Sequence, residues 1–488
     1  MHTLVQVLSP EERHEVHERS LRLLATVGVR VDSERGRQIL QQAGARVDAS
    51  TRQVKFPRPF IENALQAAPR RFSLGGRRPG WQLEMNNGDC TLLADGEAIA
   101  VFDSQNQERR EPTFEDWLKA TRLIDALDEV GVYWQMVQYS QNEANPGDVI
   151  AYWTNLFRNF SKHVQDCLED PAQTPWLLEV LQIVFGDREA IRRLHPLSWL
   201  LCPFSPLIIE ASYTDAYLET LGWDIPVAVM PMPLMGATSP ASLVTTLTLA
   251  NCETLAMLCL IEAAAPGTPF IYAPCPAVIH PRSGRYSGGS VELALLGCAT
   301  TEMGRYYGLP VEASTGGSDH FVPSIQAGYE RGINWTLPVL SMPDLLVGPG
   351  LLGGSTVLSL EQLILDVEIF RLCQRLQQGI VNREDQWLDE VIAQVGAGGN
   401  FLGHPSTRNA LYAGEWYLSQ IGFHDTYEAW LSRGRSNLLE ELRAQVEQIL
   451  ASHQPLPLDE SIIRELVLLE SRARQAHSHS SRPSQEQP

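Results

Sequence analysis

The segment LPVEASTGGSDHFVPSIQAGYE, residues 309–330, has the order strand, loop, helix. Its apolar start, which ends at Ala313, predicts a buried strand, and a pair of glycines then opens a loop that lets the backbone approach a ligand closely. The run Asp-His-Phe at 319–321 places a carboxylate, an imidazole and an aromatic ring together, and Pro323 ends the loop before a helical stretch. A loop that leaves a strand end is where barrel enzymes carry their chemistry, so this unit predicts both fold and site.

Other short apolar runs on both sides of this unit alternate with longer helical patterns. The eight predicted strands cover residues 130–137, 162–168, 197–202, 226–232, 269–275, 310–315, 344–350 and 398–403. Candidate helices between them include 240–264, 290–307 and 360–378. Eight β-then-α units with apolar strands are typical of a closed parallel barrel, so the predicted fold class is α/β, a (β/α)8 TIM barrel. An open doubly wound sheet is the alternative, but no GxGxxG fingerprint follows a strand.

The chain divides into four predicted parts. Residues 1–90 are expected to form an N-terminal helical cap, which starts at Ser-Pro-Glu-Glu (9–12), and residues 91–404 are expected to form the (β/α)8 barrel. The stretch 91–103 is expected to be a β-hairpin around an Asp-Gly turn. Helices are expected over 405–475, and the polar tail 476–488 is expected to be disordered.

Composition limits the class of protein. The 488 residues include 38 Lys and Arg against 58 Asp and Glu, which gives a formal net charge of −20. Such a charge disfavours nucleic acids and anionic membranes as partners. The apolar content of 44% and the charged content of 20% are those of a globular protein.

The cysteines and the N-terminus indicate a cytoplasmic protein. The eight cysteines include no CxxC pair, which is typical of reduced core thiols. The N-terminus is charged and has no apolar signal region. We also expect no run near the ~20 apolar residues that would span a bilayer.

Five motifs follow one another along the chain: LRLLATVGVRVDSERGRQILQQAGARVD, PLMGATSPASLVTTLTLANCETLA, RYYGLPVEASTGGSDHFVPSIQAGYE, GGSTVLSLEQLILDVEIF and GAGGNFLGHP. In this order they resemble the motifs of the trimethylamine methyltransferase family. The likeness extends over about residues 10–450. The chain has only standard residues, so it resembles the branch without pyrrolysine, which includes glycine betaine methyltransferases. The resemblance implies a (β/α)8 barrel that moves a methyl group from a methylated amine to a Co(I) corrinoid carried by a partner protein.

The chain departs from the family pattern at the expected pocket. Ser324-Ile325 replaces the usual Asp-Ala before QAGYE, and His320-Phe321 replaces small or basic residues, so the resemblance leaves the identity of the methyl donor open.

Thirteen residues are candidates for the site. Asp319 and His320 are the candidate catalytic residues, and Asp319 would orient either the amine or the loop. The candidates for substrate binding are Phe321, Tyr272, Tyr286, Trp134 and Thr238, and those for contact with the corrinoid are Gly316, Gly317, Gly350, Gly353, Gly354 and His404.

Demethylation of a quaternary ammonium needs neither a general acid nor a protein nucleophile. Its leaving group is a neutral amine, and the corrinoid attacks the methyl carbon. The protein must hold the cation in a dry pocket that is more aromatic than acidic, and aim one methyl outward. No resident metal is expected, because His280, Cys275 and His320 lack paired ligand spacing.

Two other functions remain open. The barrel could bind or sense a quaternary amine without transferring a methyl group, or it could be a lyase or hydrolase with a general base. If the chain transfers methyl groups, its expected partners are a small methylated amine, a corrinoid-binding protein and, as a possibility, further copies of the chain.

Overall fold

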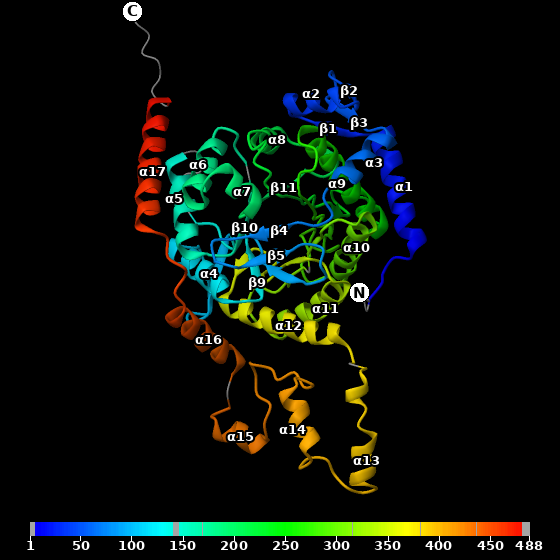
Figure 1. Cartoon of the computed structure of the whole chain (residues 1–488), viewed down its shortest axis with the longest axis vertical. Helices are drawn as coiled ribbons and strands as arrows, with labels where there is room; N and C mark the ends of the chain where they lie inside the picture. The colour runs from blue at the N-terminus through cyan, green and yellow to red at the C-terminus, as the bar shows by residue number, and fades with distance from the viewer. Residues whose placement is uncertain are drawn as a thin grey trace, which may run out of the picture.

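A computed structural model describes residues 5–139, 146–167, 169–314, 316–380, 382–435 and 437–480 (Figure 1). At its centre are eight short parallel strands. They are β6 (Thr91–Leu93), β9 (Val130–Tyr133), β10 (His163–Cys167), β11 (Leu197–Leu201), β13 (Val227–Val229), β15 (Phe270–Tyr272), β17 (Glu312–Ser314) and β18 (Leu345–Val347). Their order is β15-β13-β11-β10-β9-β6-β18-β17. A parallel bridge between Tyr272 and Val311 joins the two end strands, so the sheet closes into the predicted barrel.

The eighth strand lies elsewhere than predicted. Residues 398–403 form no strand, and Phe401 and Leu402 are exposed there. The missing strand is β6, which pairs with β9 and β18. The predicted hairpin over 91–103 is therefore wrong: β6 is a barrel strand, while β7 (Ala100–Asp103) pairs antiparallel with β8 (Glu108–Arg110) in another sheet. That sheet also contains β19 (Leu351–Leu352) and β20 (Val357–Leu358).

A ring of helices surrounds the barrel, one or two after each strand. They are α4 (Phe114–Ala126), α5 (Pro146–Asn159), α6 (Thr174–Phe185), α7 (Arg188–Leu194), α8 (Ala211–Leu218), α9 (Leu243–Ala264), α10 (Val291–Tyr307), α11 (Ile325–Ser341) and α12 (Leu360–Gln378). Polar cap residues fix several starts. For example, Thr113 and Asp116 form a reciprocal capping box at α4. Short strands β14 (Leu234–Met235) and β16 (Ala277–Val278) pair in the loops after β13 and β15.

Alternate strand residues face the barrel interior or the helices. Leu93, Val132, Leu200, Ile271 and Leu345 form one buried cluster inside the barrel. Their neighbours in sequence, such as Leu92, Tyr133 and Tyr272, belong to the larger cluster beneath the helices. This period of two follows from the pleat of a β-strand.

The N-terminal part closes one end of the barrel and adds a small sheet. It contains α1 (Pro10–Thr26), β1 (Val29–Val31), α2 (Glu34–Gln42), β2 (Arg46–Asp48), β3 (Gln53–Lys55), α3 (Arg58–Ala67), β4 (Ser73–Gly75) and β5 (Gln82–Glu84). The hairpin β4–β5 lies across the barrel in Figure 1, and Leu74 packs into the interior cluster. The sheet β12-β1-β3-β2 includes β12 (Ile208–Ile209), which comes from the loop after β11.

Helix α9 corrects one expectation. Its 22 residues are long and apolar enough to cross a membrane, contrary to the prediction that no such run exists, and 83% of the apolar window is buried inside the protein. It packs against α1, α2, α3 and α10. The same apolar composition therefore serves the core.

The C-terminal region begins with a protruding segment. It contains a 3-10 turn (Glu384–Gln386), α13 (Asp389–Val395), α14 (Pro405–Tyr412) and α15 (Tyr427–Ser432), none of which has a buried residue (Figure 1). The chain then returns to the barrel through α16 (Leu438–Ser452) and α17 (Glu460–Ser480), which pack on α12 and α5 respectively. Of the tail expected to be disordered, residues 476–480 belong to α17, and 481–488 lie outside the described residues.

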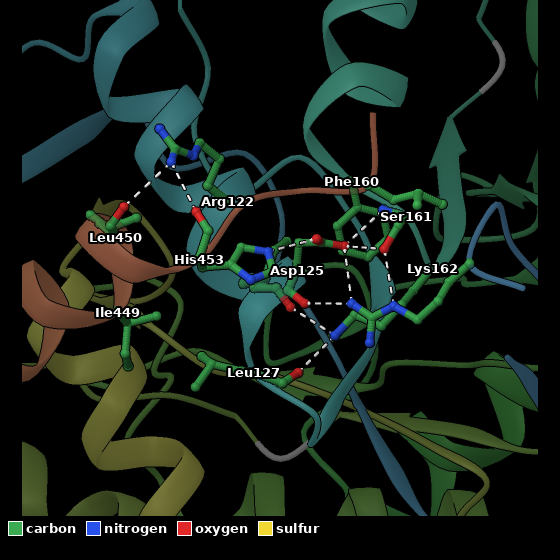
Figure 2. A network of polar contacts seen from close by, with 12 residues as sticks. Arg122, Asp125, Leu127, Phe160, Ser161, Lys162, Ile449, Leu450 and His453 are labelled. Atoms are coloured by element: carbon green, nitrogen blue, oxygen red, sulfur yellow. Dashed lines mark hydrogen bonds and ion pairs between the residues drawn. The ribbon is translucent and has the colours of Figure 1, made fainter. Parts of the chain in front are cut away.

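A buried polar network attaches the end of α16 to the barrel base (Figure 2). Asp125 accepts hydrogen bonds from the backbone and hydroxyl of Ser161, both at 2.7 Å, and from His453 Nε2 at 2.8 Å. Lys162 donates to the carbonyls of Ile124, Leu127 and Val130 at 2.5 to 2.9 Å. Burial lowers the pKa of Lys162 to about 8. These contacts lie at the start of β10, at the end of the barrel opposite the strand ends that carry the candidate site.

Candidate functional site

The carboxyl ends of the barrel strands bring an acid and two aromatic rings to the mouth of the barrel. Asp95 follows β6 and Trp134 follows β9, and each is two residues beyond an inward-facing residue, Leu93 or Val132. Both side chains therefore point toward the barrel axis. Tyr286 comes from the loop after β15, and the charge of Asp95 acts on its hydroxyl.

Asp95 was missed by the sequence reasoning because its Asp-Gly pair reads as a hairpin turn. It is partly exposed, and its oxygens accept hydrogen bonds from Gly96 N at 2.9 Å and from Ser355 Oγ at 3.0 Å. Burial raises the pKa of Asp95, while these hydrogen bonds and the charge of Arg331 oppose the shift. The signal that could have found it is a carboxylate directly after the apolar run TLLA.

The two rings lie on glycines. A β-carbon at Gly96 would overlap the indole of Trp134, and one at Gly354 would lie 3.1 Å from the ring of Tyr286. The Nε1 of Trp134 is buried and has no hydrogen-bond partner among the described residues. Burial, followed by nearby charges, raises the pKa of Tyr286 far above its usual value, so this hydroxyl stays neutral. Together the three side chains offer π faces and one carboxylate, which suits a small organic cation.

Asp319 joins two loops at the mouth. Its carboxylate accepts from Ser287 Oγ at 2.7 Å and from Gly289 N at 3.2 Å, both in the loop after β15. In the opposite direction, Gly317 N of the loop after β17 donates to Gly288 O at 2.8 Å. These contacts connect the loops after β15 and β17, and the role expected for Asp319 stays a prediction.

His320 and Phe321 lie beside the loop after β18. The Nδ1 of His320 is 2.9 Å from Val322 O and 3.1 Å from Ser324 Oγ, so this nitrogen is used within the loop. The ring of Phe321 packs on Gly353 and carries the guanidinium of Arg285 at 5.4 Å from its centre. Phe321 is 42% exposed and already has a cation on one face.

The candidate glycines shape these loops. Gly353 N donates to His320 O at 2.8 Å and Gly354 N to Ser318 O at 2.9 Å, which joins the loops after β17 and β18. Gly316 has a φ of 67°, and a β-carbon there would overlap Leu293. The space against Gly353 and Gly354 is filled by Phe321 and Tyr286, so these glycines admit the chain's own rings.

A buried ion pair holds the loop after β18. The Arg331 guanidinium lies 3.3 Å from Asp366, and neither side chain is exposed. Arg331 also donates to the carbonyls of Gly348 and Leu351, and Gly350 N donates to Asp366 at 2.7 Å. This loop carries Ser355, which bonds Asp95, so the ion pair supports the mouth indirectly.

Three candidates lie away from the mouth. Tyr272 faces outward from the barrel, is fully buried, and donates to Asn251 Oδ1 at 2.8 Å on α9. Thr238 accepts from Leu234 N at 2.8 Å within a turn before α9. His404 caps α14 in the protruding segment, with Nδ1 2.8 Å from Ser406 Oγ. The structure does not bring these three to Asp95.

An acidic cavity of about 520 Å³ adjoins the strand ends of β9 and β10. Its lining includes Glu97, Asp166 and Glu169 beside Tyr152 and Tyr213. Burial, with Glu97 and Glu169 adding repulsion, raises the pKa of Asp166 to about 7. Tyr152 donates to Asp166 at 3.0 Å. These carboxylates give this side of the barrel a field that attracts cations.

No group of three His, Cys, Asp or Glu residues is placed to hold a metal ion within the described ranges. His280 is exposed and its backbone N bonds Arg285 O, while His320 is committed to its own loop.

The closed barrel, with Asp95, Trp134 and Tyr286 at the carboxyl ends of its strands, defines a (β/α)8 protein whose candidate site lies where barrel enzymes usually carry theirs. A model of the family described as trimethylamine methyltransferase (MTTB) matches residues 2–476. The chain belongs to this family. The family and the names of its relatives support a methyl-transferring enzyme.

Named relatives cover nearly the whole chain. The trimethylamine methyltransferase MttB of Desulfitobacterium hafniense is 28% identical over 457 residues, which are 93% of this chain and 91% of the relative. A glycine betaine methyltransferase from another strain of the same species is 26% identical over 457 residues, 93% of this chain and 94% of the relative. The monomethylamine methyltransferase structure from Methanosarcina barkeri aligns over 97% of this chain and 93% of its own, with 11% identity and a TM-score of 0.46.

Proposed function

We propose that this protein transfers a methyl group from a quaternary amine to the Co(I) corrinoid of a partner protein. The observation that carries the proposal is the placement of Asp95, Trp134 and Tyr286 around the barrel mouth. The family membership supports the methyl transfer, and the pattern of one acid and two rings supports a cationic donor.

The proposed methyl transfer does not require a general acid or a general base from the protein. The displaced group leaves as a neutral amine, so the chain has no proton to deliver. Its tasks are to hold the cation, exclude water and present one methyl carbon outward. The faces of Trp134 and Tyr286 would attract the cation, and each such contact contributes about 0.5 to 2 kcal/mol. Asp95 adds attraction at the rim.

The corrinoid enters as the second substrate, bound to its own protein. It would approach from outside the barrel, over the loops after β15, β17 and β18. The joined loops are suited to this role because Asp319 and the backbone bonds of Gly317, Gly353 and Gly354 fix their shape before docking. A rigid rim lowers the entropy cost of docking.

The test is an anoxic assay with free Co(I) cobalamin and a panel of donors: glycine betaine, proline betaine, carnitine and choline. The absorbance change on corrinoid methylation is followed for the natural chain and for Asp95→Asn. We expect one donor to react, and Asp95→Asn to slow the reaction. Asp103→Asn, at the end of β7, is the control and should react normally. A donor that binds by calorimetry without any transfer would contradict the proposal and favour a sensor.

A further inference from the structure

A polar pair crosses the interior of the barrel below the mouth. Gln165 on β10 and Glu312 on β17 lie on strands four places apart in either direction around the eight-stranded ring. Gln165 Nε2 donates to Glu312 Oε2 at 2.8 Å, and both residues are 0% exposed. A hydrogen bond between opposite strands therefore spans the barrel interior beside the apolar cluster that includes Leu345, the register partner of Glu312, and Ser198 with His163 forms a second polar pair there.

One side-chain oxygen of each residue in this pair has no hydrogen-bond partner in the part of the chain that the structure describes. Glu312 Oε1 and Gln165 Oε1 are buried and make no hydrogen bond with any described residue. Burial raises the pKa of Glu312 to about 8, so its carboxyl is mainly protonated at neutral pH. Because Gln165 donates to Oε2, the proton belongs on Oε1. Glu312 is thus a buried O–H donor with no acceptor among the described residues, which proteins rarely tolerate unless a ligand or water completes it.

The donor lies at the inner end of the site. Glu312 precedes Ser314 by two residues on the same face of β17, a rise of about 6.6 Å along the strand. Cys275 lies within electrostatic range of both carboxyl groups, Asp95 and Glu312. Ser314 and Cys275 are partly exposed. Small side chains therefore separate the buried donor from the mouth.

We propose that Glu312, positioned by Gln165, donates a hydrogen bond to the carboxylate of a zwitterionic methylated amine whose cationic head lies between Asp95, Trp134 and Tyr286. This assignment rests on the proposed function and narrows its substrate class to betaine-like donors. A neutral carboxyl binds a carboxylate through a short, charge-assisted O–H···O bond, whereas an ionised one would repel it. With its carboxylate directed inward, the substrate presents its methyl groups outward.

The test compares two ligands that differ in the carboxylate. Glycine betaine and tetramethylammonium are titrated calorimetrically into the full chain and into Glu312→Leu and Glu312→Gln. Loss of a charge-assisted hydrogen bond should weaken glycine betaine about tenfold to a hundredfold in Glu312→Leu. Tetramethylammonium should change by less than about twofold. Glu312→Gln keeps an N–H donor and should recover part of the betaine affinity.

Glu253→Gln is the matched control. Glu253 is a buried glutamate on α9, and its burial raises its pKa to about 7. Its carboxylate accepts hydrogen bonds from Ser205 Oγ and Leu207 N, which lie outside the barrel. Its replacement should leave the ratio of the two affinities unchanged. Thermal unfolding of each variant identifies loss of fold.

The outcomes distinguish a failure of the Glu312 anchor from a failure of the proposed methyl transfer. A selective loss of betaine binding in Glu312→Leu supports the anchor. Equal losses for both ligands, or no loss, would overturn it and leave the cation site intact. If the natural chain binds neither ligand, the proposed function fails, and the anchor with it.

Discussion

The buried ion pair between Arg331 and Asp366 makes the firmest quantitative prediction, through Arg331→Met. This change keeps most of the apolar length of the side chain and removes the charge. It leaves Asp366 fully buried without its cation, although Gly350 N and Gln362 Nε2, each at 2.7 Å, still donate to it. Breaking a buried pair from one side costs about 3 to 5 kcal/mol.

Because two donors to Asp366 remain, we expect the loss of stability from the broken ion pair to lie near the lower end of this range. The carbonyls of Gly348 and Leu351 also lose their donor, which lowers the stability further. The free energy of unfolding should fall by about 4 kcal/mol in denaturant titrations. Arg371→Met is the control. Arg371 is paired with Glu129 at 2.6 Å but is 25% exposed, so its loss should cost about 1 kcal/mol or less.

A double-mutant cycle decides the cause. In Arg331→Met with Asp366→Asn, no uncompensated buried charge remains, so the double variant should be more stable than the sum of the single effects by about 1.5 to 3 kcal/mol. Additive losses within about 0.5 kcal/mol would refute the claim that the charge pair, rather than packing, holds the loop.

Three further predictions concern the candidate site and the polar network at the base of the barrel. Trp134→Ala should weaken tetramethylammonium binding about threefold to thirtyfold by calorimetry, while the exposed Trp416→Ala should not change it; equal affinities would remove the cation–π argument. Asp319→Asn should speed amide exchange at Gly289, its backbone donor, by about tenfold, and unchanged exchange would mean that the loops are held otherwise. Lys162 has a folded pKa of about 8 against 10.5 when exposed, so the unfolded chain binds more protons between these values and the free energy of unfolding rises with pH there. Lys162→Met should abolish a rise in the free energy of unfolding of up to about 3 kcal/mol between pH 8 and 10.5. If the rise persists in this variant, other groups cause it.

Much of the fold was predictable because most barrel strands are continuous apolar runs. Seven of the eight predicted strands are confirmed. The eighth failed because the Asp-Gly pair that follows β6 reads as a hairpin turn, and because strand pairing depends on distant segments that local composition does not reveal. The run at 398–403 has apolar residues but forms no strand and pairs with none of the described strands.

The site was harder to predict because the register of each strand decides which of its side chains point into the barrel. Trp134 and Tyr272 are both aromatic residues at or near strand ends, yet Trp134 points inward and Tyr272 outward. A shift of one residue exchanges the two faces, and single-strand patterns that are apolar throughout do not define which face is inside. Gln165 and Glu312 could not be paired from sequence for the same reason, since 147 positions separate them.

The central claim is that a methyl group leaves a quaternary amine at this barrel mouth and arrives on a corrinoid. The most direct measurement uses glycine betaine with ¹³C in its N-methyl groups, incubated anoxically with the protein and Co(I) cobalamin, and follows the label by NMR. The account predicts that labelled methyl appears on cobalt in equal amount to demethylated amine. Recovery of the labelled betaine intact, although it binds the protein, would contradict it.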